Sequence, residues 1–449
     1  MAQETVHLLS QGSGYGVLVG VGALFAIGMI STTKFLGRYL HEDSGSTEVF
    51  MVANRQVGTP LLASSVYLSW SWATELLMVC AMVYNYGVMS SYWYGAGLAI
   101  QICLMALLGI EAKKKTPNCH TSLEIVGARY GTPCHILFTF LCLANNLLAC
   151  CSMIVAAASA ISVIAGNLHI VASTMLIPFG VLLYTTVGGL KATFLTDFVH
   201  TLVLLIILCY INTSVVSSKE IGGIYGLYDL VTKHEGDRYV KGNFEGSFLT
   251  GKSQGGIFFG IVLAIGNFGL TVMDSSFWQK SFSANVKASF PGYIIATFFI
   301  FANVWGIGSL VGLASIVLEK NPIFPTYPRA MTTYEVLSGY NLPFTVKALL
   351  GDGGVGAILL SIYLAATSTV SAQMISVSSI LSFDIYRKYF KPKAGNKQMI
   401  RVSHLGVIFF GLFSGGFSVM LHYVGVNMTW LNYFIAMIIC PGMYQIGVI

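Results

Sequence analysis

Apolar stretches of about twenty residues recur along the whole chain, and they constrain its fold more than any other feature. A helix needs about 20 apolar residues to cross the hydrocarbon core of a bilayer. Charged residues make up only 9% of the chain, against about a quarter in soluble domains. The sequence therefore predicts an all-α polytopic membrane protein, a single transmembrane domain over 1–449. About eleven spans are expected, at 15–37, 59–88, 91–112, 135–166, 168–187, 196–217, 255–279, 289–318, 355–383, 401–425 and 427–449.

The distribution of Lys and Arg predicts the orientation of these spans. One set of alternate loops and helix ends holds 16 of the 24 basic residues, and the other set holds 8. Because cytoplasmic loops are enriched in Lys and Arg, the first set is predicted to be cytoplasmic. The amino terminus is then extracellular. The net charge of +6 follows from this bias and gives no reason to expect a nucleic-acid partner.

Two spans contain polar residues where a membrane helix is expected to be apolar. In the second span, Ser69, Trp70, Ser71, Trp72 and Thr74 lie among aliphatic residues. In the seventh span, the segment 266–274 places two glycines around Asn267 and ends at Asp274. Broken helices at midplane are typical of transporter binding sites. Small and polar residues of this kind also serve close helix packing, which is the alternative.

The two interrupted spans are five helices apart. If spans two to six form one unit, about 59–217, and spans seven to eleven another, about 255–449, each interruption lies in the first helix of its unit. An odd number of helices per unit inverts the second unit relative to the first. Matched interruptions in two halves indicate an inverted-repeat transporter. The helix at about 15–37 then precedes the two repeats.

Three acidic residues stand out within predicted spans, since an acidic residue costs about 2.5–3.5 kcal/mol at a helix centre. They are Glu75, Asp197 and Asp274. Each could bind a cation, relay a proton or hold a substrate amide. As alternatives, Asp197 could lie at the interface beside Lys191, and Asp274 could be a helix-end charge near Lys280.

The ninth span carries a cluster of small hydroxyl side chains at 367–371. Hydroxyl and carbonyl oxygens are the ligands that hard cations prefer. Hydroxyls can equally bond to carbonyls one turn back in their own helix. The spacing alone leaves both interpretations open.

The run YTTVGGLKA at 184–192 resembles the signature of the sodium:solute symporter family, and the match continues to Asp197. Within that family the chain is most similar to the urea active transporter branch of fungi and plants. The matching blocks are GLKATFLTD at 189–197, GNFG at 266–269, FPTYP at 324–328 and SFDIYR at 382–387. The resemblance runs from the first span to the last residue. Because the family usually continues with further helices, we expect a chain ending at Ile449 to be truncated.

The resemblance implies a LeuT-like five-plus-five fold with one extra amino-terminal helix. It also implies a sodium site between the ninth span and the broken second span. Ser368 and Thr369 match the family's hydroxyl ligands, and Ala365 matches its carbonyl ligand. The second-span carbonyls would come from Leu68 and Ser71, and Asp197 matches an acidic position associated with cation movement. Glu75 is not part of the family's sodium pattern, so the coupling ion, sodium or proton, stays open.

The function implied by this resemblance is import of urea across the plasma membrane by cation-coupled symport, without a cofactor. Urea offers one carbonyl acceptor and two amide donors, so a selective pocket should pair these groups. We expect Glu75 or Asp274 to accept the amide protons. The other residues expected around urea are Trp70, Trp72, Asn267 and Trp278.

Three other functions compete with urea symport. A symporter of the same fold for polyamine, amino acid or sugar is one, because Glu75 and Asp274 could pair with ammonium groups. A passive urea channel is the second. The third, a membrane enzyme or sensor, has no support, since the inspected motifs contain no nucleophile–base pair, metal cluster or phosphate loop.

Overall fold

The computed structural model describes residues 6–39, 46–166, 168–235, 238–426, 430–431 and 434–435. Within these residues the chain forms helices, turns and two isolated β-bridges. Eight helices are long and apolar enough to cross a membrane, or up to nine if the bent pair 59–70 and 73–86 is one span. The prediction of an all-α polytopic membrane protein is confirmed.

The helices of the first half run from the extra amino-terminal helix to the long element α8. The first long helix is built from α1 (Gln11–Tyr15), a π-helical turn η1 (Gly16–Val21) and α2 (Gly22–Tyr39). The rest of this half comprises α3 (Thr47–Val52), the 3₁₀ turn η2 (Ala53–Arg55), α4 (Thr59–Trp70), α5 (Ala73–Tyr86), α6 (Met89–Lys115), α7 (Ser122–Ile164) and α8 (Ile170–Ser217).

The second half begins after a loop region that contains α9 (Gly223–Glu235) and η3 (Phe244–Gly246). It includes a second broken helix and the long, largely buried helix α15. Its elements are α10 (Gln254–Met273), α11 (Ser275–Ser283), α12 (Val286–Ile307), η4 (Gly308–Gly312), α13 (Leu313–Leu318), α14 (Thr333–Leu337), α15 (Asn341–Ser379), η5 (Ile380–Phe390) and α16 (Asn396–Tyr423).

Two of the predicted spans, 168–187 and 196–217, are joined more tightly than predicted. They correspond to two helices within α8 that meet at Gly189, the one residue of α8 outside helical geometry (φ 58°, ψ −154°). A glycine at positive φ redirects a helix within one residue, so no loop is needed. The last predicted span, 427–449, lies almost entirely outside the described residues.

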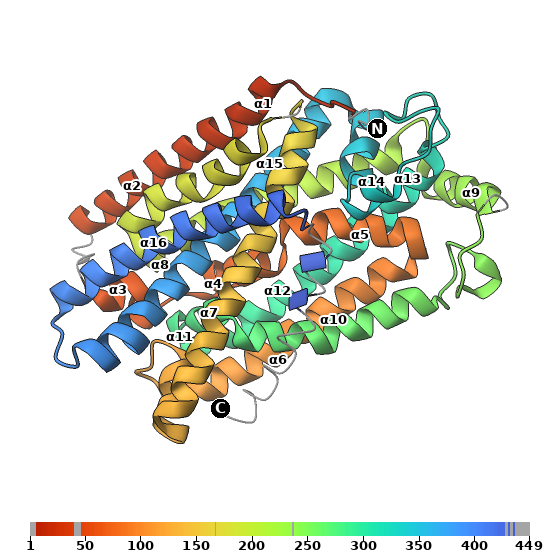
Figure 1. Ribbon diagram of the computed structural model, residues 1–449. Helices are drawn as coiled ribbons and strands as arrows, with labels where there is room; N and C mark the ends of the chain where they lie inside the picture. Colours follow the sequence, from red (N-terminus) through yellow and green to blue (C-terminus); the bar gives the residue numbers. More distant parts are fainter. Residues whose placement is uncertain are drawn as a thin grey trace.

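The helices form one bundle, with α4, α5, α11 and α15 at its centre (Figure 1). Every residue of α11 is buried, as are residues 73–84 of α5 and 358–379 of α15 apart from Leu360. Small residues make this possible, because Ala, Ser and Thr let neighbouring backbones approach closely. Helices α6, α8, α10, α12 and α16 pack around this centre.

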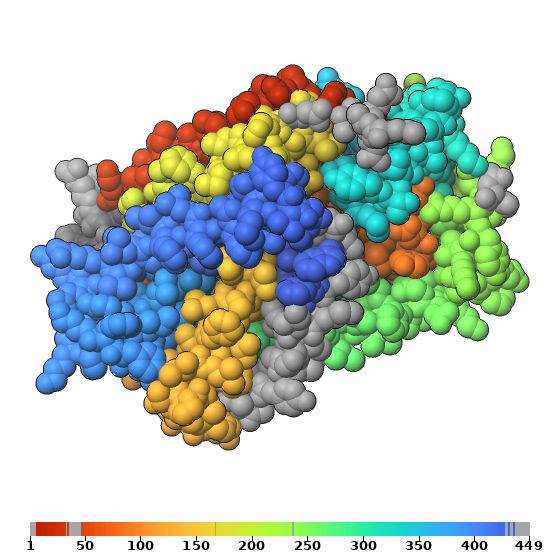
Figure 2. Space-filling view, in the orientation of Figure 1, coloured from red at the N-terminus to blue at the C-terminus, as the bar shows by residue number. Residues whose placement is uncertain are grey.

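The two ends of the bundle carry different connecting segments. In Figure 1, α9, α13 and α14 gather at one end, and α3 and the α15–α16 connection lie at the opposite end. Figure 2 shows part of α5 (orange) in a strip between segment 319–340 (cyan) and the green region of α9 and α10. The end of α5 is therefore next to these connecting segments.

We expect Gly189→Ala to destabilise the protein by more than about 1 kcal/mol, because alanine is strained at positive φ. Its added Cβ would also lie 2.6 Å from the carbonyl oxygen of Phe50 in α3. The melting temperature of the purified protein in detergent measures this effect. Gly416→Ala in α16 is the matched control, since a Cβ there meets no atom within 4 Å. Equal melting temperatures for the two variants would contradict the role of Gly189.

Candidate functional site

Two helices are interrupted inside the bundle, as the sequence predicts. The chain leaves helical geometry at Ser71 and Trp72, and α4 and α5 meet there at an angle of 54°. The second break is at Asp274, between α10 and α11. The sequence correctly indicates which spans are broken, but segment 266–269 stays helical within α10. The carboxylate of Asp274 accepts a hydrogen bond from the backbone N–H of Ser276 (2.7 Å) and so caps the start of α11. A glycine has no side chain that could accept this bond.

The first break is stabilised by side chains of its own segment. The indole N–H of Trp72 donates to the carbonyl of Ser69, and the hydroxyl of Ser69 donates to the carbonyl of Ser65 at 2.8 Å. Backbone groups that lose their helical partners in a region without water must find others. Trp72 therefore has a structural role at the break, while its ring remains free to line a cavity.

The second break is held by amides from two other helices. Gln373 on α15 donates to Asp274 Oδ2 at 2.6 Å, and Asn146 on α7 donates to Asp274 Oδ1 at 3.4 Å. Asn146 also donates to Gln373 Oε1 at 2.8 Å. Asp274 is fully buried in this network. Its carboxylate connects α7, α11 and α15.

A cavity lies between α5, α6 and α10, next to the break at Trp72. The volume open to the centre of a water-sized molecule is about 50 Å³. Apolar side chains form most of the wall, and three groups with polar atoms, Glu75, Tyr94 and Asn267, line it as well. A mostly apolar pocket with a few polar groups is the usual form of a small-molecule site. The remaining lining residues are Trp72, Met78, Phe259, Val262, Leu263, Leu270 and Ile435.

The polar groups of this cavity are oriented by their neighbours. Thr74 donates to Glu75 Oε2 at 2.9 Å. Gln101 on α6 accepts from Asn267 Nδ2 (3.4 Å) and from Thr271 Oγ1 (3.2 Å), and it donates to the carbonyl of Leu263 at 2.9 Å. Gln101 therefore fixes the orientation of the Asn267 amide across the α6–α10 contact.

The cavity brings together three of the six residues predicted to bind substrate, namely Trp72, Glu75 and Asn267. The other three, Trp70, Asp274 and Trp278, do not line it. The ring of Trp70 packs on Phe277 with centroids 4.0 Å apart, and the Trp278 indole donates to the carbonyl of Val272 at 2.7 Å. Sequence reasoning missed Tyr94 and Gln101. Gln101 had a usable signal, because it is an isolated amide within the third apolar span.

The predicted cation-coupling residue, Asp197, lies in a second polar cluster between α4, α8, α11 and α15. The hydroxyls of Ser65 and Ser368 donate to its two carboxylate oxygens. Lys280 Nζ lies 3.7 Å from Asp197 Oδ2. Asp197 is fully buried and its charged neighbour is Lys280, whereas the alternative interpretation places it beside Lys191.

The residues predicted to bind sodium lie on α15 and on the last turn and end of α4, two helices that pack against each other. Ser368 contacts Asp197, and the hydroxyl of Thr369 donates to the carbonyl of Ala365 at 3.3 Å. Helix α15 packs against α4, whose last turn contains Leu68 and ends just before Ser71. Among the described residues, no group of three or more His, Cys, Asp or Glu could hold a metal ion. A sodium ion would depend instead on hydroxyl and carbonyl oxygens.

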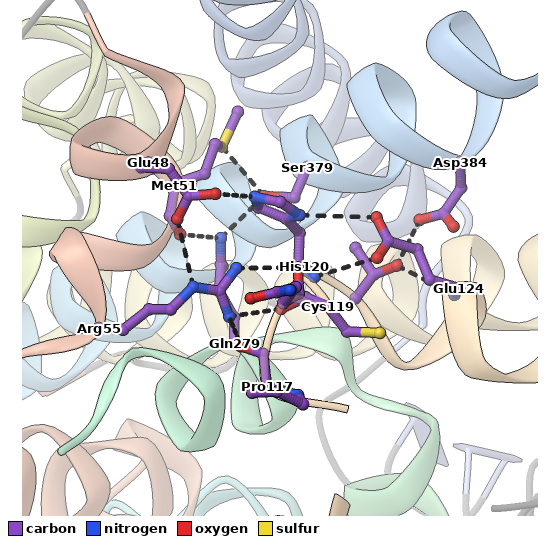
Figure 3. Close-up of polar contacts among 12 residues, drawn as sticks. Glu48, Met51, Arg55, Pro117, Cys119, His120, Glu124, Gln279, Ser379 and Asp384 are labelled. Carbon is purple, nitrogen blue, oxygen red and sulfur yellow. Dashed lines mark hydrogen bonds and ion pairs between the residues drawn. The ribbon is translucent and has the colours of Figure 1, made fainter. Parts of the chain in front are cut away.

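A third polar network closes the end of the bundle where α3 lies. Figure 3 shows Arg55, which follows α3, reaching the loop between α6 and α7. Its guanidinium donates to the carbonyls of Pro117 (2.7 Å), Asn118 (3.0 Å) and Cys119 (2.9 Å). Arg55 Nε also donates to Glu48 at 3.2 Å. The segment that leads into α4 is therefore tied to the loop that leads into α7.

His120 extends this network toward the end of α15 (Figure 3). His120 Nε2 lies 2.7 Å from Glu48 Oε1, and Nδ1 lies 3.7 Å from Glu124 Oε1. Burial lowers the pKa of His120, but hydrogen bonds and charge from Glu124 and Glu48 outweigh it, so the net pKa is raised above 6.5. The hydrogen bond to His120 lowers the pKa of Glu48 to about 2, against the effect of burial and with help from Arg55.

We expect the stability that His120 contributes to depend on pH. Since its pKa is raised in the folded state, this contribution is full below pH 6.5 and declines as pH rises through the folded pKa. The melting temperatures of wild type and His120→Gln should differ more at about pH 5.5 than at about pH 9. Adding Glu48→Gln should reduce the difference at low pH. A difference that does not change with pH would contradict this account.

Comparison with known proteins finds matches over most of the chain. The sequence profile of the Sodium:solute symporter family matches residues 50–448. The chain is 40% identical over 436 residues to "Probable urea active transporter 1" of Schizosaccharomyces pombe, covering 97% of this chain and 65% of that protein. It is 40% identical over 439 residues to "Urea active transporter" of Saccharomyces cerevisiae, covering 98% and 60%. It is 33% identical over 458 residues to "Urea-proton symporter DUR3" of Oryza sativa subsp. japonica, covering 98% and 62%.

The chain spans about three fifths of the length of these relatives. Its fold is similar to a solved structure of a Na⁺-coupled sialic acid symporter in a substrate-bound, outward-open state. The TM-score is 0.71 at 17% sequence identity, and the match covers 92% of this chain and 82% of that chain.

Proposed function

We propose that this chain, which belongs to the sodium:solute symporter family, imports urea across the plasma membrane by cation-coupled symport. The observation that carries the proposal is the cavity beside the broken helix α4–α5, where Glu75 and Asn267 lie in an otherwise mostly apolar wall. Relatives named as urea transporters, at up to 40% identity, support the choice of substrate.

The chemistry of the cavity suits a small neutral diamide. The carboxylate of Glu75 can accept N–H bonds from urea, and the amide of Asn267 can pair with either end of it. The rings of Trp72 and Tyr94 limit the space available to larger solutes. A pocket that provides hydrogen bonds discriminates strongly against solutes that lack the matching groups, because its buried polar atoms would stay unpaired.

The two broken helices suggest how the fold is organised for transport. In our proposal, residues 59–217 and 255–449 are the two inverted repeats of a LeuT-like fold, and the helix at about 15–37 precedes them. Each break lies in the first helix of its repeat. The similarity to a solved symporter of the family supports this arrangement. The Lys and Arg bias of the loops supports an extracellular amino terminus.

Polar contacts hold each end of the bundle closed, and breaking one set at a time would let the two ends open alternately. At the α3 end, Arg55 and His120 hold the segment before α4 against the start of α7. At the other end, Glu319 accepts from Tyr84 at the end of α5 (2.9 Å) and from the backbone of Met331 (2.6 Å). Each set of contacts joins a broken helix to a neighbouring segment. Opening one end while the other stays closed would expose the cavity to one side at a time.

Cation coupling determines whether uptake can concentrate urea. One cation crossing 100 mV contributes about 2.3 kcal/mol, and a tenfold cation gradient adds about 1.4 kcal/mol. Together these support accumulation of about several hundred-fold. A passive channel cannot exceed equal concentrations for a neutral solute, so accumulation separates the two functions.

Polyamine transport is not proposed. That alternative depended on Glu75 and Asp274 pairing with two ammonium groups of one substrate. Only Glu75 lines the cavity, and Asp274 is engaged with Ser276, Gln373 and Asn146. The relatives named above support urea instead.

We expect cells that lack their own urea transporter to accumulate radiolabelled urea above the external concentration when they express this chain. An ionophore that abolishes the cation gradient should lower the internal urea concentration to the external one, while slower equilibration of urea continues. Varying sodium and pH independently identifies the coupling ion. Accumulation that is unaffected by the ionophore, or absent from cells with the chain in their plasma membrane, would contradict the proposal.

We expect Asn267→Ala to raise the urea KM by about 5- to 150-fold, since losing a buried hydrogen bond and leaving its partner unpaired costs about 1–3 kcal/mol. Uptake kinetics at matched surface expression measure this change. Gln398→Ala is the control, because it removes an exposed amide at the start of α16, far from the cavity. Unchanged KM in Asn267→Ala would remove this residue from the proposed site.

A further inference from the structure

We propose that the ammonium of Lys280 supplies the positive charge at the predicted cation site, in place of a bound cation. Its charge then excludes tight sodium binding at that site. Lys280 would then be the residue that determines cation specificity. The inference rests on the proposed cation-coupled function and on the cation site that the family resemblance implies between α4 and α15. It goes further by assigning a role to Lys280, which that site does not include.

The position of Lys280 is the first observation. Lys280 lies on α11, the second half of one broken helix, and its side chain is 1% exposed. Its ammonium donates to the carbonyl of Ser65 at 2.9 Å and to the hydroxyl of Ser69, both on α4. The ammonium thus crosses from one broken helix to the other and ends in the last two turns of α4. These turns contain Leu68, one of the carbonyls predicted to bind sodium.

The charge on the opposite side of this ammonium is Asp197. Its Oδ2 lies 3.7 Å from Lys280 Nζ, and the serine hydroxyls described above donate to both of its oxygens. A buried carboxylate and a buried ammonium at this distance compensate each other, and removing one leaves the other unpaired at a large penalty. The two charges of this pair therefore compensate each other without an added ion.

The predicted sodium ligands provide no further charge. Ser368 already donates its proton to Asp197, and Thr369 donates to the carbonyl of Ala365. A sodium ion placed among these neutral oxygens would lie close to the Lys280 ammonium in a region that excludes water. Like charges repel strongly under these conditions, and no unpaired carboxylate of the cluster would offset that repulsion.

The other ionisable groups near this cluster are engaged elsewhere. Asp274, six residues before Lys280, is held by the backbone of Ser276 and by Gln373. Glu75 lines the substrate cavity. His200, one turn after Asp197 on α8, packs edge-on against Phe25 of α2 with centroids 4.4 Å apart. Asp197 is thus the carboxylate whose charge Lys280 directly meets.

The geometry predicts how the charges of this cluster control sodium binding, and the test of this prediction needs no urea. Replacing Lys280 by a neutral residue leaves Asp197 without its counter-charge, beside the hydroxyls and carbonyls of α4 and α15. Sodium should then bind and stabilise the fold, because a ligand that binds only the folded state raises its stability. Replacing Asp197 as well should abolish that sodium effect, since the cluster is again neutral.

The test measures the melting temperature of the purified full chain in NaCl, KCl and choline chloride at equal ionic strength. We expect wild type and Lys280→Arg to show no sodium-specific shift. We expect Lys280→Gln to gain a rise of about 2–4 °C in saturating NaCl. We expect the double variant Asp197→Asn with Lys280→Gln to lose that rise. Lys280→Met, which keeps the length of the side chain, replaces Lys280→Gln if the latter does not fold.

A sodium-specific shift in wild type, as large as that in the neutral variants, would overturn the proposal. So would a folded, monodisperse Lys280→Gln or Lys280→Met protein that does not respond to sodium. The wild-type measurement is informative even if neither neutral variant folds. None of these readouts depends on transport, so a failed urea assay would leave this test intact.

Discussion

Two interruptions of helical hydrogen bonding, inside a bundle that excludes water, determine how the rest of the protein is arranged. An interrupted membrane helix leaves backbone groups that must find partners, because each unsatisfied group costs several kcal/mol in hydrocarbon. At the first break, the indole of Trp72 donates to the carbonyl of Ser69, and Lys280 donates to the carbonyl of Ser65 one turn before the break. At the second, Asp274 caps α11 and is itself held by Gln373.

These partners explain why the centre of the bundle is polar as well as buried. The side chains from other helices that complete the two breaks come from α7, α11 and α15, so these helices are fixed relative to one another where the chain is irregular. The cavity opens beside the first break and is lined by α5, α6 and α10. The Asp197–Lys280 pair lies on the other side of the same break. Movement of α4 relative to α5 would therefore affect both regions.

Sequence patterns predict much of this architecture, for physical reasons. Hydropathy reveals the helices because the bilayer fixes their length, and polar residues inside apolar spans reveal which helices are broken. The second break lies at the end of the predicted segment 266–274, at Asp274 and not at the glycines, because the carboxylate of Asp274 accepts the backbone N–H of Ser276 and caps the next helix. The tight joint between the two helices of α8 depends on the backbone angles of a single residue, Gly189.

The candidate site was only partly predictable, because a residue type does not reveal the direction of its side chain. Trp70 and Trp72 are two positions apart, yet Trp72 lines the cavity and Trp70 packs on Phe277. Lys280 was considered only as a neighbour of Asp274 at a helix end. Its reach to Asp197 depends on how α11 packs against α4 and α8, and nothing in the local sequence encodes that distance.

The measurement that tests the central claim most directly is an experimentally determined structure of the protein with urea bound. The account predicts density for urea between α5 and α10, within hydrogen-bond distance of Glu75 and Asn267 and against the ring of Trp72. Urea bound elsewhere in the bundle, for example beside Trp70 and Phe277, with this cavity filled only by water or lipid, would contradict it.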